Sequence, residues 1–143
     1  GRMTGFLKEW VDELDCYDIS ETALAYAMQN TQQFEGLSFW QANLTEDRLP
    51  SDSYDLVFDF VVVQHQSDER KWRSAIANYV QSTKPGGIVF MVEQRVDDGP
   101  NKVPHVRNAS AETYRRTLGE FGCDIMLDEL TPWNEICLIG RRR

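Results

Sequence analysis

The residue types that could do chemistry in this chain stand where apolar, strand-like runs end. The clearest is Asp18, a carboxylate that directly follows the short run Cys16-Tyr17. A carboxylate at a strand end can accept hydrogen bonds from two neighbouring hydroxyl groups, such as those of a ribose. Alternatively, Asp18 caps the helix that follows, although Ser20 is better placed for that role. The other residues at expected strand ends are Ile19, Asn43, Leu44, Asp59, Phe60, Gln64, His65, Glu93, Gln94 and Arg95.

Two apolar runs, and the helical pattern between them, are expected to position these residues. Residues 54–63 are too continuously apolar for a surface strand and predict a central one, and residues 88–92 predict another. The intervening residues 68–83 have helical spacing, and Lys84-Pro85-Gly86-Gly87 predicts a turn. This order is typical of a crossover in a parallel sheet. We also expect helices over 4–14, 20–30 and 110–121, and in the second of them Leu24, Ala27 and Met28 should face inward. A short strand is expected at 16–17, and further strands over 37–42, 124–130 and 135–140, of which the last two would form an antiparallel hairpin. Residues 95–109 are expected to form a long loop.

Length and charge limit the class of protein. The chain has 143 residues, enough for one domain over residues 1–143. Its 23 acidic and 15 basic residues give a formal net charge of −8, and nucleic-acid binding proteins are normally basic. We therefore expect no nucleic-acid partner. No apolar run predicts a membrane partner or a signal peptide, and the terminal arginines 141–143 are expected to form a solvated tail.

The cysteines indicate the redox compartment. Cys16, Cys123 and Cys137 lie far apart, are odd in number and lack metal-ligand spacing. We expect buried, reduced thiols, no metal site and a cytoplasmic location.

Several short motifs follow one another in an order that resembles a known family. Each motif is weak alone, but the ordered set is similar to class I, Rossmann-like methyltransferases that use S-adenosylmethionine (SAM). The resemblance extends over nearly the whole chain. The motifs are DIS at 18–20, LP at 49–50, YDLV at 54–57, VQH at 63–65 and KPGG at 84–87.

The resemblance implies a fold, a cofactor and residue roles. The fold would be an α/β three-layer sandwich with a mostly parallel sheet and an antiparallel last strand. SAM would be the cofactor, with Asp18 on the ribose and Ile19 against the adenine. Asn43 stands where the family keeps an aspartate for the adenine amino group, and Leu44 would complete that end. The methionine moiety would face the backbone near Asp59 and Phe60, and His65.

The sequence departs from the family at its beginning. The family's first strand ends in an acidic residue followed by GxGxG, whereas this chain starts with Gly1-Arg2-Met3-Thr4-Gly5. Gly1 would be the last glycine of that loop, and we expect an N-terminally incomplete domain. The absent strand would lie centrally in the sheet, between strands 2 and 4. The other interpretation is a natural truncation rescued by pairing with a second chain, as in a homodimer.

Polar side chains outside the cofactor motifs favour a small, polar methyl acceptor. His65 could act as a general base, or it could hold the strand–helix junction by a hydrogen bond. An essential base is needed only when the acceptor must lose a proton. Five further acceptor-site candidates together favour a polar or anionic acceptor, although each one alone is more typical of a surface residue than of a catalyst: Glu93, Arg95, His105, Arg107 and Tyr114.

Two other classes of function compete with the methyltransferase interpretation. A non-catalytic binding or scaffold protein would keep the fold without the glycine-rich loop. A nicotinamide-dependent oxidoreductase is disfavoured, because the antiparallel C-terminal hairpin belongs to the methyltransferase pattern.

Overall fold

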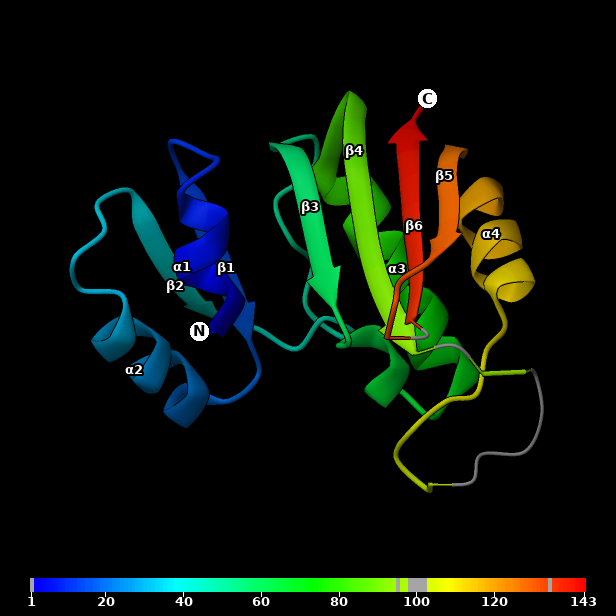
Figure 1. Ribbon diagram of the computed structural model, residues 1–143, viewed down its shortest axis with the longest axis horizontal. Coiled ribbons are helices and arrows are strands. Elements are labelled where there is room, and N and C mark those ends of the chain that lie inside the picture. The colour runs from blue at the N-terminus through cyan, green and yellow to red at the C-terminus, as the bar shows by residue number, and fades with distance from the viewer. Residues whose placement is uncertain (1, 95, 98–102, 134) are drawn as a thin grey trace. The chain divides into compact units, whose positions relative to one another are not determined.

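The computed structural model describes residues 2–94, 96–97, 103–133 and 135–143 (Figure 1). The chain forms two compact units, residues 1–43 and residues 44–143, each with its own sheet. The single domain over residues 1–143 stays a prediction. Within the described ranges, no helix is both long enough and apolar enough to cross a membrane.

The first unit is a two-stranded parallel sheet with two helices. The carboxyl ends of the two strands lie side by side, because the strands are parallel and their last residues, Asp18 and Gln41, pair with each other. The second helix contacts both strands. The elements are α1 (Arg2–Lys8), β1 (Leu14–Asp18), α2 (Glu21–Asn30) and β2 (Leu37–Gln41).

Two expectations for this unit are wrong in detail. The first helix ends at Lys8 instead of continuing to residue 14, because Leu14 opens β1 and pairs with Leu37. Met28 was expected to face inward, yet its side chain is 49% exposed. The inward face of α2 is formed by Leu24 and Ala27, and Met28 lies one position further round the helix.

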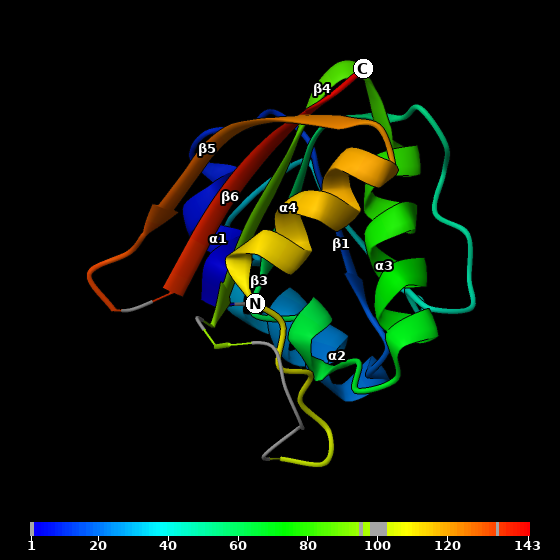
Figure 2. The same cartoon turned by 90° about the vertical axis from the view of Figure 1, so that its right-hand side faces the viewer.

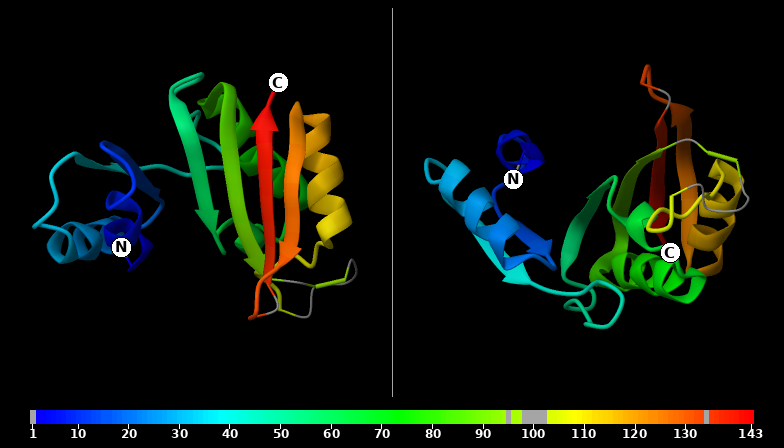
Figure 3. Two further views of the ribbon diagram at one scale, coloured as in Figure 1. Left: turned by 45° about the horizontal axis from the view of Figure 1, so that its top comes forward. Right: turned by 90° about the horizontal axis from the view of Figure 1, so that it is seen from below.

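The second unit is a four-stranded mixed sheet with two helices on one face (Figure 2). The strand order is β3-β4-β6-β5, in which β3 and β4 are parallel and β6 is antiparallel to both of its neighbours. Figure 3 shows the four strands side by side. The elements are β3 (Tyr54–Phe60), the 3₁₀ turn η1 (Val63–His65), α3 (Glu69–Ser82), β4 (Thr83–Gln94), α4 (Ala111–Glu120), β5 (Cys123–Leu130) and β6 (Glu135–Arg142).

The core of the second unit lies between the sheet and its two helices. Four large side chains on the inner face of α3 are at most 5% exposed, and α4 adds Tyr114 and Leu118. The inward side chains of α3 are Trp72, Ile76, Tyr79 and Val80. The expected α/β class and the antiparallel last strand are thus confirmed.

The predicted central strand over residues 54–63 differs from the observed one in two ways. It stops at Phe60, because Val61 has a φ of +58° and leaves the extended conformation. In addition, β3 lies at the edge of its sheet, where β4 is its only strand partner among the described residues. Asp59 is the one fully buried residue of β3 and Leu56 is 40% exposed, so the apolar run correctly predicted neither full burial of this strand nor the pairing of both its edges.

The KPGG segment, residues 84–87, lies within β4, whereas the sequence predicted a turn that precedes the strand. Tyr54 pairs with Thr83 and Leu56 with Ile88, so residues 84–87 bulge opposite a single residue of β3. Gly86 has a φ of +80°, which glycine adopts readily. A Cβ on Gly87 would lie 2.9 Å from the Lys84 carbonyl oxygen, so only glycine fits there without a shift.

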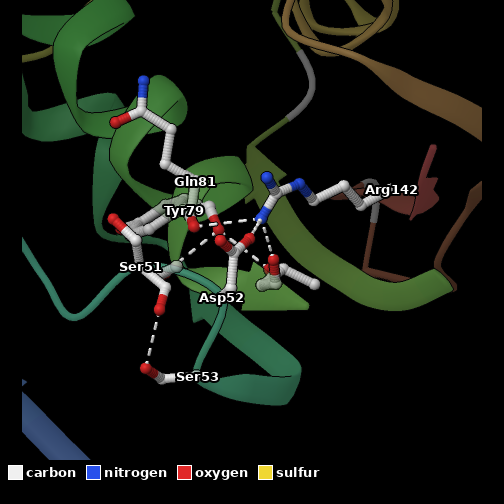
Figure 4. Close-up of polar contacts among 8 residues, drawn as sticks. Ser51, Asp52, Ser53, Tyr79, Gln81 and Arg142 are labelled. Carbon is white, nitrogen blue, oxygen red and sulfur yellow. Dashed lines mark hydrogen bonds and ion pairs between the residues drawn. The ribbon is translucent and has the colours of Figure 1, made fainter. Parts of the chain in front are cut away.

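The terminal arginines are not a solvated tail, since β6 extends to Arg142 (Figure 4). The Arg142 side chain is 22% exposed. Its Nη1 donates to the Asp52 carboxylate, to the Thr83 carbonyl and, at 3.0 Å, to the Gln81 carbonyl. Arg142 therefore ties the end of the last strand to the end of α3.

We expect Arg142→Ala to destabilise the protein by about 1–2 kcal/mol, because it removes charge-assisted hydrogen bonds from a largely buried group. Thermal unfolding followed by circular dichroism would show a melting temperature several degrees lower. The matched control is Arg141→Ala, because Arg141 is exposed and adjacent. Equal melting temperatures for the two variants would contradict the role of Arg142.

Candidate functional site

The carboxylate of Asp18 lies at the exposed end of β1. Its Oδ1 accepts a hydrogen bond from the backbone N–H of Ser20 at 2.8 Å. Ser20 in turn caps α2, because its Oγ accepts from the Ala23 N–H at 3.2 Å. The helix cap is thus supplied by Ser20, and Asp18 holds the turn that leads to it.

The ends of β1 and β2 are tied together next to this carboxylate. The Ala42 N–H donates to the Asp18 carbonyl at 3.0 Å, and Gln41 Nε2 donates to the Ile19 carbonyl at 3.1 Å. The Ile19 side chain is 63% exposed, and Asn43 is half-buried at the end of the same unit. A carboxylate beside an exposed apolar side chain is a surface that suits a ribose and a base.

Leu44 belongs to the second unit, and its side chain packs against the core there. Its carbonyl accepts a hydrogen bond from Asn78 Nδ2 at 3.1 Å. Leu44 therefore has a structural role within its own unit. Its predicted place at the adenine end stays a prediction.

At the end of β3, a buried carboxylate holds a strained turn. Asp59 is 2% exposed, and its two oxygens accept from the N–H groups of Val62 at 3.2 Å and Val63 at 3.5 Å. Val61, which lies between β3 and these two valines, is β-branched and yet has a backbone conformation in the left-handed region. Strained backbone of this kind is common at functional sites. The Asp59 side chain is used internally, while the predicted contact near Asp59 and Phe60 requires only backbone.

A second buried carboxyl, Glu93, lies on the same face of the sheet. Asp59 pairs with Met91 in the parallel register, so the side chain two residues later points the same way. Glu93 is fully buried, and no donor in the described ranges hydrogen-bonds to either of its oxygens.

Burial governs the protonation of this carboxyl pair. Loss of solvent raises the pKa of Asp59 to about 6 and, together with the charge of Asp59, raises the pKa of Glu93 well above its ordinary value. Such a pair titrates as a unit, and it holds a proton in the folded state that the unfolded chain releases. Because Glu93 is buried and paired with Asp59, we expect no direct contact between its side chain and a methyl acceptor.

Tyr114, another acceptor-site candidate, lies in the core of the second unit. It is 1% exposed, and its ring centroid is 5.1 Å from that of Trp72 in an edge-on arrangement. Burial and the nearby charge of Glu93 raise the pKa of Tyr114. The phenol therefore stays neutral.

The two histidines of the chain are brought together. The rings of His65 and His105 stack with centroids 5.9 Å apart and an interplanar angle of 13°. Both residues are exposed. Beside them, Gln64 fastens the region, because its Oε1 accepts from the Gln94 N–H at 3.2 Å and its carbonyl accepts from the Arg107 N–H at 2.7 Å. The chain thus presents two stacked imidazoles, His65 from η1 and His105 from the segment before α4.

Arg107 points toward the helices of the second unit. Its guanidinium carbon lies 4.8 Å from the centroid of the Trp72 ring, and Nη2 is 3.7 Å from Glu69 Oε2. Two further residues of the predicted site, Gly1 and Arg95, lie outside the described residues.

The sequence profile of the methyltransferase domain family matches residues 1–87 of this chain. The chain belongs to this family. The match confirms the predicted resemblance to Rossmann-like, SAM-dependent methyltransferases. A comparison with curated proteins found no match.

Solved structures show that the fold of this methyltransferase domain is shared widely. N-methyltransferase NodS from Bradyrhizobium japonicum WM9 is 24% identical over 96% of this chain and 76% of its own, with a TM-score of 0.77. A SAM-dependent methyltransferase from Mesorhizobium loti is 16% identical over 96% of this chain and 86% of its own, with a TM-score of 0.78. The [4+2]-cyclase SpnF is 13% identical over 91% of this chain, with a TM-score of 0.76, and this chain covers 66% of SpnF. At these identities the likeness shows the fold alone.

Sequence reasoning missed the pairing of Asp59 with Glu93. A signal was present, because strand alternation places Val57 and Asp59 on one face of β3, and the register with β4 adds Glu93 to it. Finding the pair required the register between two strands that are distant in sequence. The sequence placed Gln64 at a strand end, but it did not show that Gln64 links η1 to Gln94 and to Arg107, because these segments meet only after folding.

Proposed function

We propose that this chain is a SAM-dependent methyltransferase that acts on a small polar acceptor. The observation that carries the proposal is the exposed Asp18 carboxylate beside the exposed Ile19 side chain at the end of β1. Asp18 would bind the ribose and Ile19 would pack against the adenine, with Asn43 and Leu44 completing that end. The NodS structure, whose complex contains S-adenosyl-L-homocysteine, supports the same cofactor class.

Bound SAM supplies an electrophilic methyl group, so the residues of this chain mainly bind and orient. The strained turn at Val61, held by Asp59, would present backbone groups to the methionine moiety. His65 would accept a proton only from an acceptor that must lose one. His105 stacks on His65 and would orient it.

The setting and partners of this enzyme belong to the proposal as well. All three cysteines are free thiols, which supports a reducing, cytoplasmic compartment. A homodimer through strand edges stays a prediction. Nothing in the comparisons favours the non-catalytic alternative.

Asp18→Ala is expected to weaken SAM binding about thirtyfold or more, because two hydroxyl groups lose a charged acceptor worth roughly 2–4 kcal/mol. Isothermal calorimetry on the complete protein would measure the change. Glu21→Ala is the matched control, since it removes an exposed acid from the adjacent first turn of α2. Equal affinities of wild type and Asp18→Ala would remove Asp18 from the site.

A further inference from the structure

A cavity of about 370 Å³ opens on the second unit between α3, α4 and the segment before α4. This volume is at the lower end of the roughly 300–1,000 Å³ typical of small-ligand sites. Its charged lining residues are Arg73 from α3, Arg116 from α4, Arg107 from the preceding segment, and Glu69. The lining carries three positive charges and one negative charge, and the Glu120 carboxylate paired with Arg73 brings the local sum to +1, on a chain with a net charge of −8.

Hydrogen-bond donors in this cavity outnumber acceptors. Arg116 makes no hydrogen bond or ion pair within the part of the chain that the structure describes. Within the described ranges, the Nε atom of Arg107 is buried without an acceptor, and the Glu69 carboxylate is 3.7 Å from Nη2. Trp72 also lines the cavity and is 1% exposed; its indole Nε1 neighbours the Tyr114 phenol and meets no acceptor at full hydrogen-bond geometry among the described residues. Buried donors without acceptors are costly, so the cavity favours a ligand that brings oxygens.

Two of the three arginines, Arg107 and Arg73, are held in place before any ligand arrives. The guanidinium of Arg107 lies over the Trp72 ring. Arg73 donates to Glu120 at 2.6 Å and lies 5.1 Å from the centroid of the Phe121 ring. Fixed guanidinium groups lose little side-chain entropy on binding an anion.

We propose that this cavity binds a small phosphate-bearing anion, gripped by Arg107 and Arg116, with Arg73 adding positive charge. A planar carboxylate is satisfied by the two-pronged fork of one guanidinium, whereas a tetrahedral dianion accepts donors from several directions. The three arginines come from three segments of the chain, which suits the tetrahedral ligand. This inference does not rest on the proposed methyl transfer.

The test is a titration of the ¹⁵N-labelled full chain with inorganic phosphate and, separately, with glycerol phosphate, at constant ionic strength set by sodium chloride. We expect a saturable shift of the Trp72 indole N–H signal, while the other three tryptophans serve as internal references. Arg116→Ala should weaken binding about tenfold, since one charge-assisted contact is lost. Arg70→Ala is the matched control: it removes an equal charge from an exposed position of α3 and should change affinity less than twofold.

Arg116→Lys keeps the positive charge but lacks the planar guanidinium, so its affinity for phosphate should lie between those of wild type and Arg116→Ala. Binding of both probes would identify a phosphomonoester ligand, and binding of inorganic phosphate alone would identify free phosphate. The proposal is overturned by a shift that does not saturate, by an equal response to chloride, by succinate binding in place of phosphate, or by equal losses in Arg70→Ala and Arg116→Ala. Circular dichroism of each variant would verify that its fold is retained.

Discussion

Glu93→Gln is expected to stabilise the protein near neutral pH and to flatten the dependence of its stability on pH. Glu93 is fully buried, and loss of solvent and the charge of Asp59 raise its pKa well above the ordinary value of 4.5. The stability that the protonated carboxyl contributes is fully present below the unfolded pKa. It is lost as pH rises through the folded pKa, at about 1.4 kcal/mol per pH unit for one proton.

Asp59 acts in the same direction. Its pKa is raised from 3.8 to about 6, so the folded state holds an additional proton between these values. We therefore expect wild-type stability to fall between pH 4 and pH 7. A glutamine at position 93 resembles the protonated acid in shape and can donate to Asp59, and it does not titrate.

Urea unfolding at several pH values between 4 and 7.5 would measure how steeply the unfolding free energy changes with pH. Glu129→Gln is the matched control, because Glu129 is an exposed acid on β5. Its slope should equal that of wild type. A Glu93→Gln variant that is less stable than wild type throughout, with an unchanged slope, would show that the carboxyl pair does not hold a proton.

Trp72→Ala is expected to destabilise the second unit by about 3–5 kcal/mol, the range seen when a buried aromatic side chain leaves a cavity. Trp72 is 1% exposed and lies between Arg107, Tyr114 and the sheet. Trp72→Phe keeps an aromatic ring and removes an indole N–H that has no acceptor in the described chain. This variant should therefore lose clearly less unfolding free energy than Trp72→Ala.

Chemical unfolding of both variants would give the two values. Trp133→Ala is the control, since that tryptophan is 79% exposed in the same unit and its loss should change stability by less than about 0.5 kcal/mol. If Trp72→Ala and Trp133→Ala were equally stable, Trp72 would not be part of a packed core.

Local sequence determined where three of the helices begin and which residues of α3 face inward. Ser20, Asp68 and Ser110 each accept a hydrogen bond from a backbone N–H of the first helical turn, so the helix starts could be predicted from residue type. The inward stripe of α3 could be predicted in the same way, because helical periodicity is a short-range property. The family resemblance needed only the order of short motifs, and residues 1–87 match the family profile.

Long-range pairing was decided only by the tertiary structure. The continuous apolar run over residues 54–63 could not show that Val61 adopts a positive φ, because that turn depends on hydrogen bonds to Asp59 and on the Val61 N–H donating to the Val92 carbonyl at 2.8 Å. Nor could it show that β3 is an edge strand, since apolar faces and paired edges are separate properties.

The same reason applies to the buried groups of the second unit. Glu93 and Tyr114 looked like polar site residues in the sequence, and burial against distant segments placed both in the interior. Arg107 looked like a residue of the methyl-acceptor site, but stacking on Trp72 turned it toward α3 and α4. The position of Asp18 and Ile19 at the end of a short strand was predictable from local sequence, while their role in binding stays a prediction. The partners of Glu93, Tyr114 and Arg107 come from segments that only folding brings together.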